Sequence, residues 1–170
     1  MTLYSSAKYA RPEWERRFLL AQLPAGLDLT RFEQLEDWYW PHTRLRLRKV
    51  MTPAGEILAL KLTQKYQAPH QSDLATTITN IYLSLAEYQL LAQLPGRSLH
   101  KHRYHYLFNG HIYSIDQFQG TLQGLITAEI EADEQTLLAL PLPPFALRDI
   151  TGDLAYRGST LAYGPTITSG

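Results

Sequence analysis

The sequence predicts a mainly β fold in which a closed antiparallel sheet surrounds a polar, charged interior and several short helices pack outside. Three observations predict it. Short stretches alternate between apolar and polar residues, charged side chains recur at every second position within them, and tyrosine is abundant, with eleven in 170 residues. Alternation with a period of two is typical of strands, and aromatic side chains fit a pleated sheet well.

The composition limits the chemistry that the chain can perform. It contains no cysteine, which excludes disulfides, thiolate zinc sites and cysteine nucleophiles, so a metal would be held by oxygen or imidazole ligands. Its 16 basic and 16 acidic residues leave no net charge to attract nucleic acid or a membrane over a distance. We therefore expect neither of these as a partner.

The distribution of apolar residues predicts one domain without a membrane span. No window offers about 18 uninterrupted apolar residues, and the first residues lack the apolar segment of a signal peptide. We expect a cytoplasmic protein with a single domain over residues 1–170 and flexible ends at 1–10 and 164–170.

The strands are recognised by their alternation and by the turns between them. Residues 42–50 alternate most clearly, and the turn at 52–56 leads from them into the next strand. Asn109-Gly110 is a hairpin dipeptide between two further strands. The expected strands cover residues 13–20, 42–50, 57–65, 75–83, 99–108, 111–118 and 125–132.

Capping patterns predict the helices. Thr30-Arg-Phe-Glu33 has the form of a capping box and predicts a short helix over 30–38. Ser84-Leu-Ala-Glu87 predicts a second helix to about residue 94, and Asp133-Glu134 a third that ends near Pro141. The last thirty residues suggest small helical or irregular pieces.

Charged residues pair at a spacing of two in strand after strand, which places each set on one face. A solvated sheet face is one interpretation of any single strand. Each strand, however, carries one dominant sign, which would cause repulsion unless an opposite charge or a ligand faces it. A closed barrel with a phosphate-rich anion and a divalent metal inside would supply both signs. The sets are Glu13/Glu15/Arg17, Arg44/Arg46/Arg48, Lys61/Lys65, Lys101/Arg103 and Glu129/Glu131.

The order and spacing of these motifs resemble the CYTH domain, or triphosphate tunnel metalloenzyme, superfamily. The likeness covers nearly the whole chain and rests on the succession of motifs, because none is specific alone. It implies a closed antiparallel eight-stranded β-barrel that forms a tunnel. The matching segments are Glu13-Trp-Glu15-Arg-Arg17, Arg44-Leu-Arg46, Leu60-Lys61, Lys101-His-Arg103-Tyr104, Ile115-Asp116 and Glu129-Ile-Glu131.

The resemblance implies hydrolysis of a triphosphate, which is inorganic tripolyphosphate or a nucleoside or thiamine triphosphate, with Mg²⁺ or Mn²⁺ as cofactor. Its motifs assign catalytic roles to Arg17, Glu13 and Glu15. They assign phosphate binding to Arg44, Arg46, Lys61, Lys101 and Arg103, and metal binding to Glu13, Glu15, Asp116, Glu129 and Glu131. The partner is a small-molecule triphosphate or polyphosphate, and the oligomeric state stays open, with a homodimer as one alternative.

Two departures from the family pattern keep a second function open. Arg17 stands where the family usually carries a lysine, and an arginine stays protonated and cannot act as a base. The strand over 75–83 carries no acidic residue, whereas many members have glutamates there. A non-catalytic phosphate- or nucleotide-binding module of the same fold, or an adenylate-cyclase-like activity, is therefore the alternative.

Other polar and aromatic residues have structural interpretations. Arg48 and Lys65 are expected to be solvated near strand ends, and Asp116 has pairing with Arg103 as an alternative role. The histidines have no spacing that closes a metal site, so surface or packing roles are expected for His42, His100, His102, His105 and His111. The aromatic run Trp38-Tyr39-Trp40 is expected to belong to a core at a helix end.

Overall fold

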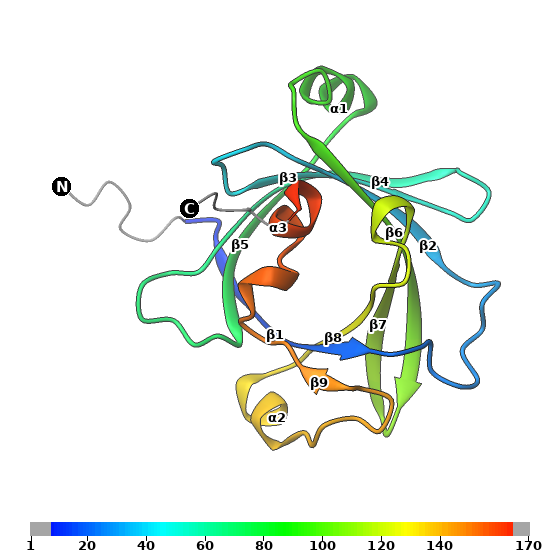
Figure 1. Ribbon diagram of the computed structural model, residues 1–170. Helices are drawn as coiled ribbons and strands as arrows, with labels where there is room; N and C mark the ends of the chain where they lie inside the picture. Colours follow the sequence, from blue (N-terminus) through cyan, green and yellow to red (C-terminus); the bar gives the residue numbers. More distant parts are fainter. Residues whose placement is uncertain (1–7, 165–170) are drawn as a thin grey trace, which may run out of the picture.

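The computed structural model describes residues 8–164, which fold around a β-barrel seen nearly along its axis in Figure 1. Eight antiparallel strands follow one another around the barrel in the order β5-β4-β3-β2-β6-β7-β8-β1, and pairing of β1 with β5 closes it. This confirms the predicted barrel. The strands are β1 (Arg11–Leu20), β2 (Glu33–Tyr39), β3 (Leu45–Met51), β4 (Ile57–Tyr66), β5 (Ala75–Tyr82), β6 (Arg97–Phe108), β7 (His111–Phe118) and β8 (Ile126–Glu131).

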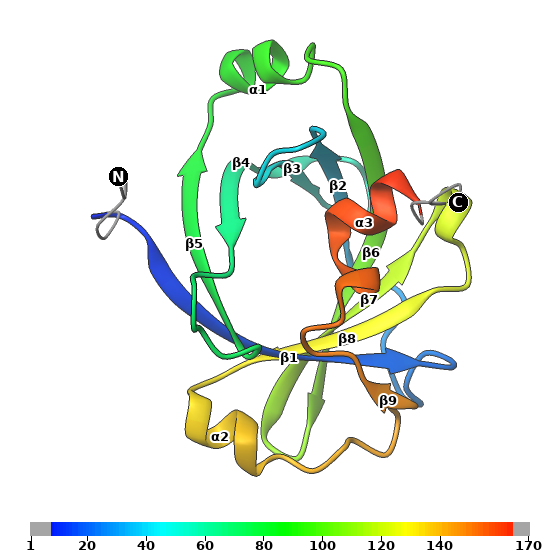
Figure 2. The ribbon, with the colours of Figure 1, turned by 60° about the vertical axis from the view of Figure 1, so that its left-hand side comes forward.

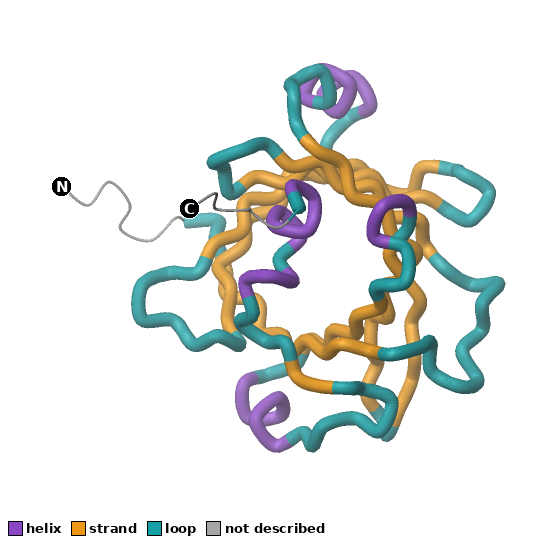
Figure 3. Tube along the Cα trace, in the orientation of Figure 1, coloured by secondary structure: helices purple, strands orange, loops and turns teal. Residues whose placement is uncertain are grey.

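Short elements complete the fold. A two-residue strand β9 (Arg148–Asp149) pairs with Phe18 and Leu19, near the C-terminal end of β1. Two residues are too few to show an alternating pattern. Helices α1 (Leu85–Leu91) and α2 (Glu134–Ala139) lie outside the barrel, as expected, whereas α3 (Gly158–Tyr163) lies within its opening (Figures 1 and 3). Two 3-10 turns cover Gly120–Leu122 and Leu154–Tyr156. Within the described part of the chain, every helix is too short or too polar to cross a membrane. The expectation of flexible ends falls largely on residues 1–7 and 165–170, which lie outside the described residues.

The main hydrophobic core lies outside the barrel wall, between the outer faces of the strands and the segments that cover them. Phe18 and Ile115 on the wall and Leu137 on α2 are fully buried in it. Burial of such side chains stabilises each by about 1.5–3 kcal/mol. On β1, β6, β7 and β8 the apolar members of the alternation face outward into this core, so most of the charged members between them point inward. The buried cluster contains Phe18, Leu20, Leu74, Tyr104, Tyr113, Ile115, Ile126, Ala128, Ile130 and Leu137.

The predicted helix over 30–38 is wrong, because Glu33–Tyr39 forms strand β2 between β3 and β6. The expected cap does not form: the backbone N–H and hydroxyl of Thr30 both donate to Asp28, at 3.0 and 2.6 Å, and make a local turn. Burial in β2 alternates, with Leu35 and Asp37 facing inward. Hydrogen bonding to two neighbouring strands outweighs the weak local preference for helix.

Candidate functional site

The barrel encloses a cavity of about 800 Å³ whose lining comes from the inward faces of the strands and from the segment after β9. Every residue that the sequence predicts for the site lines this cavity except Asp116, which lies in the wall behind it. The structure thus brings together ten side chains that are far apart in the sequence. They are Glu13, Glu15, Arg17, Arg44, Arg46, Lys61, Lys101, Arg103, Glu129 and Glu131.

Four glutamates gather on the neighbouring strands β1 and β8. The antiparallel register places Glu15 opposite Glu131 and Arg17 opposite Glu129, so these side chains share the inner face. Burial, followed by repulsion from Glu13, Glu129 and Glu15, raises the pKa of Glu131 above its usual value. This wall therefore carries negative charge that the protein itself does not fully balance.

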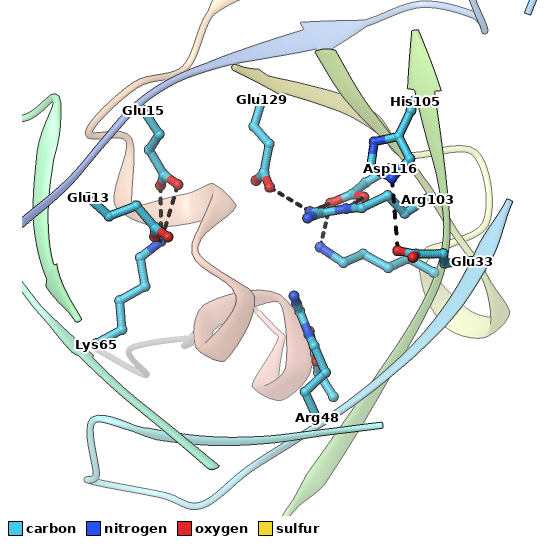
Figure 4. Close-up of polar contacts among 11 residues, drawn as sticks. Glu13, Glu15, Glu33, Arg48, Lys65, Arg103, His105, Asp116 and Glu129 are labelled. Atoms are coloured by element: carbon cyan, nitrogen blue, oxygen red, sulfur yellow. Dashed lines mark hydrogen bonds and ion pairs between the residues drawn. The ribbon is translucent and has the colours of Figure 1, made fainter. Parts of the chain in front are cut away.

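Basic residues on β6 form a buried network around Asp116. Arg103 donates through Nε to Asp116 Oδ1 and through Nη2 to Asp116 Oδ2, both at 2.7 Å, and its Nη2 lies 2.6 Å from Glu129 Oε1 (Figure 4). Lys101 Nζ also donates to Asp116 Oδ2. Burial alone would raise the pKa of Asp116, but Arg103 and Lys101 outweigh it and hold the pKa well below its usual range. Asp116 thereby fixes the two cations at the cavity wall.

Burial, together with neighbouring guanidinium groups, weakens the charge of two lysines in the cavity. It lowers the pKa of Lys101 to about 8, although the carboxylate of Asp116 opposes the shift. The pKa of Lys61 is also lowered, by burial first and then by Arg48 and Arg46. An anion bound among these groups would reverse both effects, because it would favour the charged forms.

Several cations in the cavity lack a carboxylate partner. In residues 8–164, the buried Nε atoms of Arg17 and Arg46 make no hydrogen bond. Arg46 Nη2 donates only to the hydroxyl of Thr63, at 3.2 Å. Lys61 Nζ lies 5.8 Å from the centre of the Tyr82 ring, with no carboxylate at ion-pair distance within the same described range. Buried donors without partners are costly, so this side of the cavity is suited to an anion with many oxygens.

The expectation that Arg48 is solvated is wrong. Arg48 is only 6% exposed and donates to both oxygens of Asp37, at 2.6 and 2.7 Å. Burial opposes ionisation of Asp37, but Arg48 outweighs it and keeps the pKa of Asp37 well below its usual value. Arg48 is central in β3 and lies opposite Asp37 on β2, the neighbouring strand whose local pattern predicts a helix. A helix there gives no indication that Asp37 would face Arg48.

Lys65 was likewise expected to be solvated, and it lies in the cavity instead. Strand β4 continues to Tyr66, so Lys65 faces inward with Lys61, as its spacing of four in an alternating strand indicates. Tyr39 also lines the cavity and not a helix-end core. Burial, followed by the nearby Asp37, raises the pKa of Tyr39 to about 12, so its hydroxyl is a neutral hydrogen-bond donor to the cavity.

The segment after β9 enters the barrel opening and narrows it (Figure 2). Arg17 N–H donates to Thr151 Oγ1 at 3.0 Å, and Tyr163 Oη donates to the carbonyl of Tyr39 at 3.1 Å. Gly158 packs against Tyr39 so closely that a Cβ there would lie 2.1 Å from the tyrosine Oη. Only glycine fits this contact. The segment therefore forms part of the cavity wall.

The carboxylates of the cavity suit a hard divalent cation in chemistry. Glu13, Glu15, Glu129 and Glu131 offer the oxygen ligands that Mg²⁺ and Mn²⁺ prefer, and the repulsion at Glu131 is what a cation would relieve. As the side chains stand, no three histidine, aspartate or glutamate groups among the described residues lie close enough to hold a metal. Protein cations already pair with three of the four glutamates.

Comparisons with known proteins found one relative by sequence and several by structure. No protein-family model matches the sequence. An inorganic triphosphatase from Acetivibrio thermocellus is 34% identical over 67 residues, which are 39% of this chain and only 42% of that relative. The crystal structure of the inorganic triphosphatase NE1496 has 25% identity and a TM-score of 0.59, and the match covers 89% of this chain and 95% of that one.

A second solved structure supports the fold alone. The PH1819 protein from Pyrococcus horikoshii OT3 has 20% identity and a TM-score of 0.51 over 73% of this chain and 80% of that one. The closed eight-stranded barrel with its charged cavity and these likenesses agree. The chain has a fold of the CYTH, or triphosphate tunnel metalloenzyme, type.

Proposed function

We propose that the protein hydrolyses a triphosphate, with inorganic tripolyphosphate as the first candidate, in the barrel cavity and with Mg²⁺ or Mn²⁺. The observation that carries the proposal is the division of the cavity into a wall of four glutamates and a set of cations without carboxylate partners. The names of the triphosphatase relatives support the choice of inorganic tripolyphosphate over nucleoside and thiamine triphosphates.

Phosphate binding is assigned first to the cations that the protein leaves without a carboxylate, and then to the two that Asp116 fixes in the wall. Arg46 and Arg17 present guanidinium forks, which match phosphate oxygens in pairs, and Lys61 adds a point charge. Arg44 is exposed at the edge of the cavity, where its guanidinium lies 4.4 Å from the centre of the Tyr66 ring. Lys101 and Arg103, fixed by Asp116, complete a chain of positive charge along which a linear anion fits.

Glu13, Glu15, Glu129 and Glu131 would hold the metal, which when bound supplies Lewis-acid polarisation and charge neutralisation at the phosphate. Arg17 cannot accept a proton, so its role is to orient the reacting phosphoryl group and to stabilise the charge that develops on it. A carboxylate of the glutamate wall positions the attacking water by accepting a hydrogen bond from it. The barrel wall and the segment after β9 surround the bound anion on several sides, which limits the access of other water to the reacting phosphate.

A binding module without turnover is the second candidate, and two observations favour it. Arg17 stands where the family that the sequence resembles usually carries a lysine. Strand β5 presents Thr76, Ile78 and Asn80 to the cavity, whereas many members of that family have glutamates on this strand. When ATP replaces tripolyphosphate in the incubation, release of a cyclic nucleotide would instead indicate a cyclase-like activity.

Phosphate release and binding, measured on the same preparation, distinguish these functions. The purified protein is incubated with tripolyphosphate and Mg²⁺ or Mn²⁺, and a parallel sample contains a chelator. We expect phosphate release that requires the metal. Calorimetric binding of tripolyphosphate without release under any metal condition would reject the hydrolase and leave the binding module. Glu129→Ala is expected to raise the metal concentration needed for half-maximal phosphate release, because it removes one of the four carboxylates assigned to the metal.

A further inference from the structure

Lys65, on the inner face of β4, contacts the two glutamates of β1. Lys65 Nζ is 3.2 Å from Glu13 Oε2 and 3.2 Å from both carboxylate oxygens of Glu15 (Figure 4). Glu13 and Glu15 are two of the four glutamates that are assigned to the metal. A single ammonium group therefore occupies the space between two carboxylates, where a divalent ion would be expected to bind.

Among the described residues, Glu13 and Glu15 are the carboxylates that lie within ion-pair distance of Lys65, and Glu131 lies farther away. Lys65 is opposite Ile78 on β5, and Glu13 is opposite Thr76 on the same strand. In the described residues, the ion pairs of Lys65 are those with Glu13 and Glu15 alone. Strand β4 thus supplies a positive charge at the point where the neighbouring strand lacks a carboxylate.

The second half of the glutamate wall is balanced differently. Burial would raise the pKa of Glu129, but its ion pair with Arg103 outweighs burial and lowers the pKa to about 2. Glu131 lies opposite Glu15 on the neighbouring strand. Its pKa is raised, mainly by burial and then by repulsion from the neighbouring glutamates. One ammonium beside three mutually repelling carboxylates leaves excess negative charge at this end of the cavity.

We propose that Lys65 is a resident counter-ion that competes with a divalent metal for Glu13 and Glu15, so that metal binds to this pair only when the ammonium leaves it. The metal assignment rests on the proposed function, whereas the competition concerns the metal-free protein alone. A lysine suits the role because its ammonium is a single point charge on a flexible chain, unlike the fixed fork of an arginine. Its side chain is 33% exposed, and a pair this open to water is weak enough to be displaced.

Displacement of Lys65 has a consequence for the basic side of the cavity. The freed ammonium group stays on the inner face of β4, where Lys61 also lies. It then adds one positive charge to the surface that holds the anion. Metal binding favours the position of Lys65 away from Glu13 and Glu15, and in that position Lys65 also attracts the anion. Metal binding and anion binding are therefore coupled.

Direct measurement of Mn²⁺ binding tests the competition without any substrate. Calorimetric titration of the full chain is compared with the Lys65→Met variant, in which a side chain of similar length carries no charge. We expect Mn²⁺ to bind roughly tenfold more tightly to the variant, because the attraction between the carboxylates and the ammonium no longer opposes it.

Lys61→Met is the matched control. It removes the same charge from the same face of the same strand, but Lys61 has no carboxylate at ion-pair distance in the described chain. We expect its Mn²⁺ affinity to change by less than about threefold, as a distant, screened charge would cause. Lys65→Arg retains the charge and is expected to bind Mn²⁺ no more tightly than the wild type. Circular dichroism of each variant verifies that the barrel is folded.

Equal affinity in Lys65→Met and wild type, or an equal gain in Lys65→Met and Lys61→Met, would overturn the proposal. These outcomes are separable from failure of the proposed function. A specific gain in Lys65→Met without phosphate release by the wild type would reject the hydrolase and leave the counter-ion role standing. Metal-dependent phosphate release by the wild type, without a gain in Mn²⁺ affinity in Lys65→Met, would support the hydrolase and reject the counter-ion role.

Discussion

The cations of the cavity differ in how many partners the protein gives them. Arg103 is held by Asp116 and Glu129, whereas Arg17, Arg46 and Lys61 are left with donors to spare. Groups of the first kind are fixed in place, and groups of the second kind are available to a ligand. Lys101 belongs to both, because it donates to Asp116 while burial and nearby guanidinium groups lower its pKa to about 8.

Lys101 makes anion binding depend on pH. A bound triphosphate favours the charged ammonium, so the pKa of Lys101 is higher in the complex than in the free protein. Below about pH 8, Lys101 is protonated both in the free protein and in the complex, so the affinity for the triphosphate has its full value. Above about pH 8, this affinity falls by up to about tenfold per pH unit. Calorimetric titration of tripolyphosphate without metal from pH 7 to pH 9.5 measures this fall.

Lys101→Arg is the control for the pH dependence. An arginine keeps its charge throughout this range, so the loss of affinity should disappear from the variant, while titration of the ligand itself affects both proteins equally. A wild-type profile that parallels that of the variant would show that Lys101 does not titrate in this range.

At the scale of elements, strand β2 shows what the sequence could and could not reveal. Period-two spacing placed the charged residues of β1, β3, β4, β6 and β8 on one face, and the structure puts them in one cavity. Strand β2 was missed, because the capping pattern at Thr30-Arg-Phe-Glu33 predicts a helix there. The competing signal was Asp37, whose carboxylate is stable in a buried position only because Arg48 lies opposite on β3. A contact between strands is invisible to local pattern.

Two neighbouring ion pairs on β2 and β3 provide a test of that contact. Asp37 is opposite Arg48 on the inner face, and Glu36 is opposite Lys49 on the outer face. Asp37→Asn leaves a buried guanidinium without its counter-charge and should lower the free energy of unfolding by roughly 3–5 kcal/mol. Glu36→Gln breaks a partly exposed pair and should cost less than about 1 kcal/mol.

Urea unfolding of the two variants measures both costs from the shift in midpoint at constant slope. A similar loss in the two variants would mean that Arg48 does not depend on Asp37 for its burial, and the account of β2 would need revision.

At the scale of the whole molecule, closure of the barrel reverses the usual arrangement of a small protein. The apolar faces of the strands point outward to a core beneath α2 and the covering segments, and the charged faces point inward. The sequence indicated this arrangement because unbroken runs of one charge on a strand need an opposite charge to face them. It could not indicate that the segment after β9 enters the opening, because that placement rests on single contacts such as Gly158 against Tyr39.

The central claim is that function lies on the inner face of the wall, and phosphate release from tripolyphosphate by two variants of β3 tests it most directly. Arg46 faces the cavity, whereas Lys49 faces outward and pairs with Glu36. We predict that Arg46→Ala lowers kcat/KM at least roughly tenfold, chiefly through KM, because a charge-assisted contact to phosphate is lost. Lys49→Ala should change it less than about twofold, as for other exposed ion pairs. Equal effects of the two substitutions, or full activity in Arg46→Ala, would contradict the account.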